Sequence, residues 1–265
     1  MTAIDVNALS VRVGAKRLLD GVSFKVAQGE TVAVIGPNGA GKSTLLRALS
    51  GEIAPSGGTV LLKGRAPQAW QPRELALRRA VLSQNVTVTF PFTAIEVVRM
   101  GAGDRRGKAI DALAEAALAA VDLAGFHDRI IGTLSGGEQQ RVHFARVMVQ
   151  LACGEEAHGP GILMLDEPTA SLDLRHQLDL VAVARQYAAR GTTVIAIVHD
   201  LNLAALMAER VIVLSRGRLA ADGPPAQTIT DDTLARVFAV SSAVGRVPDA
   251  AMPFVLPHRA EKHSA

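Results

Sequence analysis

The sequence is poor in cysteine and aromatic residues, and it has no long apolar run. Cys153 is the single cysteine among 265 residues, so no disulfide can form within the chain, which suits a reducing compartment. Aromatic residues make up only 3%, so the core must be mostly aliphatic. No apolar run approaches the ~18 residues of a membrane span. The first ten residues lack the basic segment of a secretory signal. We therefore expect a cytosolic protein that meets a membrane only through a partner.

The chain also has little net charge. The formal net charge is +3, with 20% charged and 49% hydrophobic residues, which is ordinary for a globular protein with a substantial core. A weak positive balance favours a solvated surface over a nucleic-acid interface. We expect no nucleic-acid partner.

Alternating strand and helix signals indicate an α/β protein with a largely parallel core sheet. Short apolar runs predict buried strands at 31–35, 162–165, 192–198 and 211–214. An outer strand is expected at 22–26 and another short strand at 59–62. Helices are expected at 42–50, 108–121 and 139–151, and a polar loop with glycine and proline at 152–161. We expect one domain over 1–240, with a core at about 1–84 and 160–240, an inserted helical subdomain at about 85–159, and a tail at 241–265.

Residues 36–44 read GPNGAGKST and match the phosphate-loop pattern G-x-x-x-x-G-K-[ST] in full. The motif follows an expected strand and opens an expected helix, where backbone N–H groups and the helix N-terminus favour phosphate. Lys42 should reach the β- and γ-phosphates, and the Ser43 hydroxyl should bind Mg²⁺. The predicted phosphate-binding residues are Gly36, Pro37, Asn38, Gly39, Ala40, Gly41, Lys42, Ser43 and Thr44.

Two acids end the apolar run at 162–165. Asp166 stands where a carboxylate would hold Mg²⁺, and Glu167 is then the candidate general base for an attacking water. His199 follows another expected strand, at the strand end that faces the ligand crevice in parallel sheets, where it could hydrogen-bond a γ-phosphate. A structural histidine is the alternative, and Gln84 is equally uninformative in isolation.

A second helix start also favours an anion. Ser135 and Glu138 have the spacing of a capping box, and Gly136 and Gly137 between them leave backbone amides uncovered. One chain with two phosphate-facing helix starts suggests a nucleotide held between two copies of the protein.

Together these segments resemble the ATP-binding subunit of an ABC transporter over nearly the whole chain. The family order is present: phosphate loop, Q-loop at Gln84, signature LSGGEQQR at 134–141, Walker B at 162–167, D-loop Ser171-Leu172-Asp173, and switch histidine His199. The resemblance implies a P-loop NTPase fold with an antiparallel β part at the N-terminus, and an ATPase that acts as a translocase.

The same resemblance implies a head-to-tail homodimer with two ATP sites. Ser135 and Gly137 would contact the γ-phosphate bound to the partner, and Asp173 would help communication across the interface. Gln84, Glu167 and His199 would be catalytic, and Gln84 would join Ser43 and Asp166 around Mg²⁺.

One position departs from the family pattern. The family places an aromatic residue on the adenine, whereas Val13, flanked by Arg12, stands at that place. Base selectivity is therefore less firmly expected than phosphate binding.

The cargo is suggested by similarity alone. Residues 90–101, FPFTAIEVVRMG, resemble the haem-importing branch, as do the insert before Walker B and the closing PFVLP at 253–257. Residues 199–204, HDLNLA, resemble the wider group that imports haem, iron–siderophores and vitamin B12. The resemblance implies a subunit on the cytoplasmic face of the bacterial inner membrane, with permease subunits and, indirectly, a periplasmic haem-binding protein. Siderophore or vitamin B12 import, a non-transport ABC ATPase and a pseudo-ATPase are the alternatives.

Two further groups of residues remain open. The other histidines show no metal-ligand spacing, so we expect surface or structural roles and no direct contact with haem; they are His127, His143, His158, His176, His258 and His263. Phe90 and Phe92 either form an exposed patch for the permease or pack into the helical subdomain.

Overall fold

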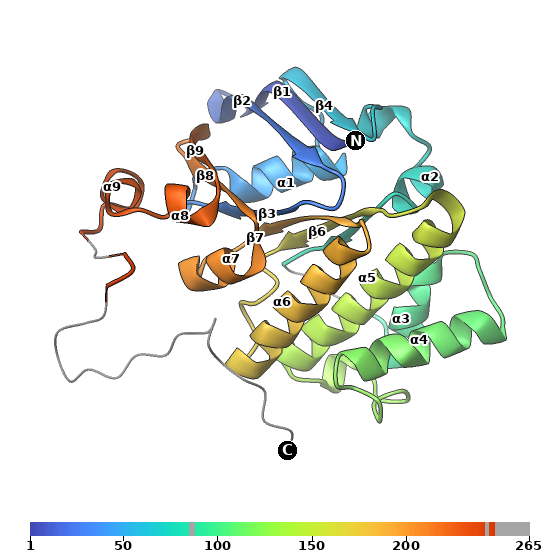
Figure 1. Cartoon of the computed structure of the whole chain (residues 1–265). Helices are drawn as coiled ribbons and strands as arrows, with labels where there is room; N and C mark the ends of the chain where they lie inside the picture. Colours follow the sequence, from blue (N-terminus) through green and yellow to red (C-terminus); the bar gives the residue numbers. More distant parts are fainter. Residues whose placement is uncertain (85–87, 242–243, 247–265) are drawn as a thin grey trace.

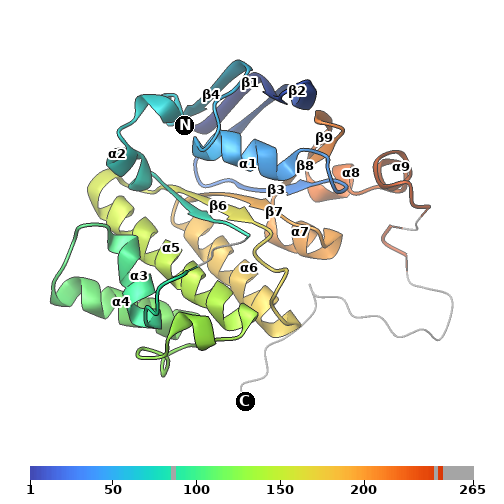
Figure 2. The same cartoon turned by 180° about the vertical axis from the view of Figure 1, so that it is seen from behind.

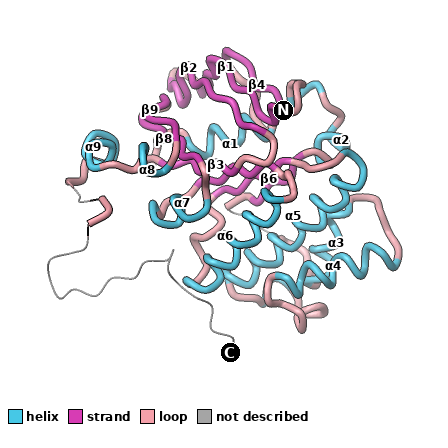
Figure 3. The backbone as a smooth tube through the Cα atoms, viewed as in Figure 1, coloured by secondary structure: helices cyan, strands magenta, loops and turns pink. Residues whose placement is uncertain are grey.

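Two β-sheets and a helical layer are stacked in the computed structural model, which describes residues 1–84, 88–241 and 244–246 (Figures 1 and 3). The strands are β1 Thr2–Val13, β2 Lys16–Ala27, β3 Thr31–Ile35, β4 Gly57–Leu62, β5 Arg79–Leu82, β6 Ile162–Asp166, β7 Thr193–Ile197, β8 Arg210–Ser215 and β9 Arg218–Gly223. The helices are α1 Lys42–Ser50, α2 Pro72–Ala76, α3 Ala94–Arg99, α4 Lys108–Ala120, α5 Gly136–His158, α6 Leu174–Ala189, α7 Leu201–Met207, α8 Pro225–Thr228 and α9 Asp231–Thr233. Single turns are η1 Pro67–Ala69, η2 Met100–Ala102, η3 Ile131–Thr133 and η4 Leu234–Phe238.

The larger sheet has the strand order β5-β6-β7-β3-β8-β9. Its strands pair in parallel except for β9, which runs antiparallel to β8. The smaller sheet, β2-β1-β4, is antiparallel. The predicted α/β class with a mostly parallel core sheet and an antiparallel N-terminal part is therefore confirmed.

Strand β3 shows how the sequence divides the core into two. Its residues are all buried, and side chains alternate between the faces of a strand. Val32 and Val34 join the cluster between the two sheets, whereas Ala33 and Ile35 join the cluster under the long helices. The views from front and back place α1 between the sheets, where Leu45 fills the first cluster (Figure 2).

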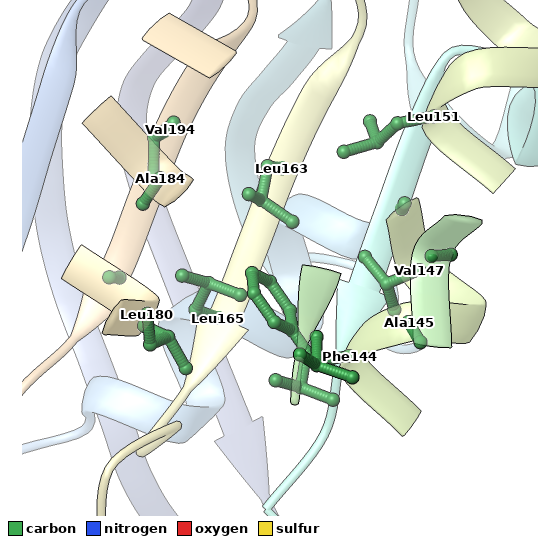
Figure 4. Packing of buried hydrophobic residues seen from close by; sticks show 14 of the residues in the cluster. Phe144, Ala145, Val147, Leu151, Leu163, Leu165, Leu180, Ala184 and Val194 are labelled. Carbon is green, nitrogen blue, oxygen red and sulfur yellow. The ribbon is translucent and has the colours of Figure 1, made fainter. Parts of the chain in front are cut away.

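Helices α5, α6 and α7 cover the other face of the larger sheet. Phe144 of α5, Leu165 of β6 and Leu180 of α6 belong to one buried cluster there (Figure 4). Helices α3 and α4 pack on α5 rather than on the sheet. The helical layer is thus two helices deep on the side of α5.

The prediction of a loop at 152–161 is wrong. Helix α5 continues to His158, and Cys153 and Gly154 are buried in it. A Cβ on Gly154 would lie 2.1 Å from the carbonyl oxygen of Leu77, so this glycine allows the helix to pass close to the backbone beside β5. The glycine marks close packing, not a turn.

Other elements agree with the sequence or were missed by it. The strand at 31–35 and the helix at 42–50 match to the residue. The sequence did not predict the long β1–β2 hairpin or α6. Trp70 lies between the guanidinium groups of Arg65 and Arg78, at 4.6 and 4.1 Å from its ring centre, and so joins the chain after β4 to the chain before β5.

Some expectations fall outside the described residues. Residues 85–87, which open the expected helical subdomain, lie there, as does most of the expected tail with PFVLP, His258 and His263. Within the ranges that are described, no helix is both long and apolar enough to cross a membrane.

Candidate functional site

The predicted phosphate loop connects β3 to α1 in a backbone conformation that requires glycine. Gly36, Gly39 and Gly41 all have positive φ angles, of 151°, 77° and 102°. A Cβ on Gly36 would lie 2.2 Å from the carbonyl oxygen of Leu214. The space beside Gly39 is open, and α1 begins after Gly41 with no side chain capping its first N–H groups. Such a start leaves backbone donors for an anion.

Lys42 places a positive charge inside this loop. Its side chain is buried, and Nζ donates hydrogen bonds to the carbonyl oxygens of Gly36 at 2.8 Å and Pro37 at 3.1 Å. Burial lowers the pKa of Lys42, while the charges of Glu167 and Asp166 oppose that shift. The ammonium is bonded to uncharged carbonyls, so the loop suits an anionic ligand.

Ser43 and Asp166 meet where β6 ends. Ser43 Oγ lies 3.4 Å from Asp166 Oδ1. Burial and the neighbouring charge of Glu167 raise the pKa of Asp166. A hydroxyl and a carboxylate are oxygen ligands of the kind Mg²⁺ prefers. Among the described residues no group of three or more His, Cys, Asp or Glu could hold a metal, so an ion here would need phosphate and water oxygens as well.

Glu167 is the centre of a polar cluster that it forms with Gln84 and His199. Its Oε1 lies 2.5 Å from His199 Nε2, and its Oε2 accepts a hydrogen bond from Gln84 Nε2 at 2.6 Å. Gln84 follows β5, Glu167 follows β6 and His199 follows β7, so three neighbouring strands deliver them to one edge. Each residue was predicted separately from the sequence, but their convergence on Glu167 was not.

The second predicted helix start has the expected cap. Ser135 is the N-cap of α5, and the Glu138 side chain accepts from the Ser135 backbone N–H at 2.7 Å. That bond lowers the pKa of Glu138. The main packing partners of α5 are α3, α4, η2 and β5, whereas α1 packs on β2, β4, β6 and β7. The two helix starts therefore belong to different layers of one chain (Figure 1).

The expected D-loop touches the signature segment. A Cβ on Gly137 would lie 2.9 Å from the carbonyl oxygen of Ser171, so the two backbones are already close. Asp173 is the N-cap of α6 and accepts from the backbone N–H of His176 at 3.0 Å, which lowers the pKa of Asp173. Sequence reasoning missed this capping role, although an aspartate before a helix is its usual signal.

Three further residues singled out by the sequence differ in exposure. Val13, at the end of β1, is 65% exposed. Phe90 is 68% exposed, whereas Phe92 packs against the large core cluster, so one ring fits each alternative. A hollow of about 360 Å³ opens beside Gln84, and it is lined by Leu46, Arg47, Glu52, Val81, Ser83, Gln84 and Asp166.

Comparison with known proteins identifies the family. The sequence model described as ABC transporter matches residues 19–170. The hemin import ATP-binding protein HmuV of Rhodopseudomonas palustris strain BisA53 is 59% identical over 254 residues, which cover 96% of this chain and 94% of that protein. HmuV of Bradyrhizobium diazoefficiens has the same identity and the same coverage of both chains.

A solved structure has the same fold. The dimeric structure of an ATP-binding cassette bound to ADP and Pi, in a post-hydrolysis state, is 25% identical with a TM-score of 0.73, and the match covers 84% of this chain and 98% of that one. With a family match over more than half of its length and relatives at 59% identity, this chain belongs to the ABC transporter family.

Proposed function

We propose that this chain is the ATP-hydrolysing subunit of an ABC importer that moves haem (hemin) through a membrane permease. The observation that carries the proposal is the polar cluster at the ends of β5, β6 and β7, next to a complete phosphate loop. The cargo follows from the relatives of 59% identity, whose names state hemin import.

The phosphate loop binds the nucleotide in this proposal. Residues 36–44 supply backbone N–H groups, and Lys42 exchanges its bonds to loop carbonyls for phosphate oxygens. Ser43 and Asp166 would hold Mg²⁺, with Gln84 as a further oxygen ligand. A Mg²⁺ ion held there would neutralise phosphate charge. Base recognition is the weakest part of the site, because Val13 offers apolar contact without an aromatic ring.

Glu167 is the general base in this proposal. A carboxylate in contact with an imidazole and an amide is held in one orientation, as a base that activates water must be. His199 orients Glu167 and reaches the γ-phosphate, and Gln84 connects the same carboxylate to the chain that enters the helical subdomain. The described residues therefore supply binding, orientation and a proton acceptor.

The functional unit is a head-to-tail homodimer with two ATP sites. Ser135, Gly136, Gly137 and Glu138 lie in a different layer from the chain's own phosphate loop, so they are better placed to face a partner's nucleotide. Asp173 then lies beside that interface. The dimeric structure of a related cassette bound to ADP and Pi supports a dimer as the functional unit.

We place the permease contact beside the polar cluster. We divide the chain into a core at about 1–84 and 160–240 and a helical subdomain at about 85–159. Phe90, as an exposed ring, and the hollow beside Gln84 are offered as the docking surface. The protein is then peripheral on the cytoplasmic face of the bacterial inner membrane, with a periplasmic haem-binding protein as indirect partner. It contacts neither haem nor nucleic acid directly.

Reconstitution tests both levels of the proposal. The full chain is assembled with its permease in proteoliposomes, and phosphate release and hemin uptake are measured with Mg-ATP. We expect uptake that depends on ATP and is lost with Lys42→Ala. Iron–siderophore and vitamin B12 serve as competing cargoes. Uptake of either in place of hemin overturns the cargo, and absence of ATP hydrolysis overturns the function.

A further inference from the structure

His176 connects the D-loop at the start of α6 to the segment that follows α4. It lies in the first turn of α6, and its side chain is only 17% exposed. Nδ1 lies 2.7 Å from Asp173 Oδ1, and because a carboxylate only accepts hydrogen bonds, Nδ1 is the donor. Nε2 lies 3.9 Å from Asp122 Oδ2, a distance for ionic attraction when the imidazole is protonated. Arg175 Nη2 lies 3.7 Å from the same oxygen.

Asp122 is itself tied to the signature helix. It follows α4 with a φ of 59°, a left-handed conformation in which glycine is less strained. Arg141, the last residue of the signature LSGGEQQR, donates from Nη1 to the carbonyl oxygens of Val121 at 2.9 Å and Asp122 at 3.2 Å. A continuous set of contacts therefore runs from Arg141 through Asp122 and His176 to Asp173.

Apolar packing alone does not fix the relative position of α4, α5 and α6, whose shared boundary we call the seam. A cavity of about 30 Å³ lies between the end of α4, α5 and α6, with Val121, Phe144, Leu180 and Val183 among its apolar lining. His176 and Arg141 line the same cavity. The carboxylates of Asp122 and Asp173 are 62% and 67% exposed, so each ion pair adds little to stability. What the contacts supply is a fixed geometry across the seam.

We propose that His176 is a positioning residue that holds Asp173 of the D-loop in register with the signature helix α5, by way of Asp122 and Arg141. This rests on the proposed function, in which the D-loop and the signature both face the partner's nucleotide. Gly137 touches Ser171 at the same seam, so a shift of the D-loop is felt directly at the signature. His176 acts on hydrolysis through Asp173 and does not touch the nucleotide.

The test replaces His176 in the full chain. His176→Leu removes both contacts, whereas His176→Asn keeps an amide near the position of Nδ1 and so keeps a bond to Asp173. Asp111→Asn is the control, because it breaks the Arg99–Asp111 ion pair, which is 2.8 Å long and lies within the helical layer away from this seam. Hydrogen exchange is followed at the amides of Ala170 and Leu172, which bond to Glu167 and Thr169 in the native loop.

We expect faster exchange at those amides in His176→Leu and unchanged exchange in Asp111→Asn. The kcat for ATP hydrolysis should fall by about 10- to 100-fold with KM within about twofold, as for misplaced groups outside the chemistry. His176→Asn should recover part of kcat. Wild-type exchange or wild-type kcat in His176→Leu overturns the proposal, and so does an equal loss of ATP affinity or an equal effect of Asp111→Asn.

Failure of the proposed function gives a different result. If the wild-type chain does not hydrolyse Mg-ATP, the proposed function fails, and exchange at Ala170 and Leu172 alone decides whether His176 positions the D-loop. If the wild type hydrolyses ATP and His176→Leu matches it, only the positioning role falls.

Discussion

The carboxylate of Glu167 lies 2.5 Å from the imidazole of His199, although the two residues follow different strands. Glu167 also has a φ of 50°, which is uncommon for a residue with a side chain. Its backbone N–H donates to the carbonyl oxygen of Ile197 at 3.2 Å, which fixes this conformation against β7. Glu167 therefore combines an uncommon backbone conformation with side-chain contacts to His199 and Gln84, a combination that is common at functional sites.

Replacement of this carboxylate tests its role as base. Glu167→Gln keeps the size of the side chain but removes the proton acceptor. We expect unchanged ATP binding and hydrolysis slower by about 10²- to 10⁴-fold, the usual contribution of a general base. Binding is measured by calorimetry and hydrolysis by phosphate release. Glu115→Gln, on the exposed face of α4, is the control. Turnover near the wild-type rate would remove Glu167 from the base role.

A methyl group on Gly137 tests the second anion site. In Gly137→Ala the new Cβ would lie 2.9 Å from the carbonyl oxygen of Ser171, so the D-loop and the helix start must separate. We expect hydrolysis to fall more than about tenfold, with ATP affinity of the monomer unchanged. Gly132→Ala is the control, because its Cβ meets nothing within 4 Å. An equal fall in monomer affinity would assign Gly137 to the chain's own pocket.

Removal of the negative charge of Asp166 should stabilise the folded protein. Burial, then the charge of Glu167, raises its pKa, so the folded state favours the protonated form. That contribution is present below the unfolded pKa and is lost as pH rises through the folded pKa. Asp166→Asn should therefore raise Tm at pH 7 without nucleotide, and the gain should shrink as the pH falls. Thermal unfolding at several pH values measures it. A lower Tm at pH 7 would contradict this sign.

The contribution of His143 to stability should depend on pH in the opposite direction. It is 3% exposed, neither ring nitrogen has a hydrogen-bond partner among the described residues, and burial, aided by Arg146, lowers its pKa to about 4. Stability from neutral His143 is present above pH 6.5 and lost as the pH falls through about 4, by up to about 3 kcal/mol.

The test of that dependence is His143→Leu, with His158→Gln on the exposed end of α5 as control. Urea unfolding at pH 7 and pH 4.5 gives the free energies. We expect the loss between the two pH values to be smaller in His143→Leu than in the wild type, and unchanged in the control. An equal loss of unfolding free energy in all three proteins would show that protonation of His143 does not contribute to destabilisation by acid.

Local patterns predicted the elements next to the phosphate loop. The strand at 31–35 is an uninterrupted apolar run, and Gly51 ends the helix after it, so both bounds follow from residues inside the segment. The end of α5 could not be found in this way. Gly154 resembles a helix breaker in the sequence, and only its approach to Leu77, far away along the chain, shows why a glycine stands there.

The same distinction between local patterns and long-range packing applies to the residues of the site. Motif spacing placed Lys42, Ser43 and Asp166, because each lies at a fixed offset from a strand or helix end. The contact between Gln84 and Glu167 joins residues 83 positions apart, and it depends on β5 pairing with β6. Sequence periodicity carries no information on which strands become neighbours, so this pairing had to come from the fold.

Trp70 gives the protein an internal optical probe. It is the single tryptophan of the chain, held between the cations of Arg65 and Arg78. Arg78 immediately precedes β5, the strand that leads to Gln84. Tryptophan emission of the unlabelled protein, excited selectively over Tyr187, therefore arises from one known place on the chain segment that leads into the polar cluster. A movement that separates the indole from either guanidinium can be followed through this emission in real time.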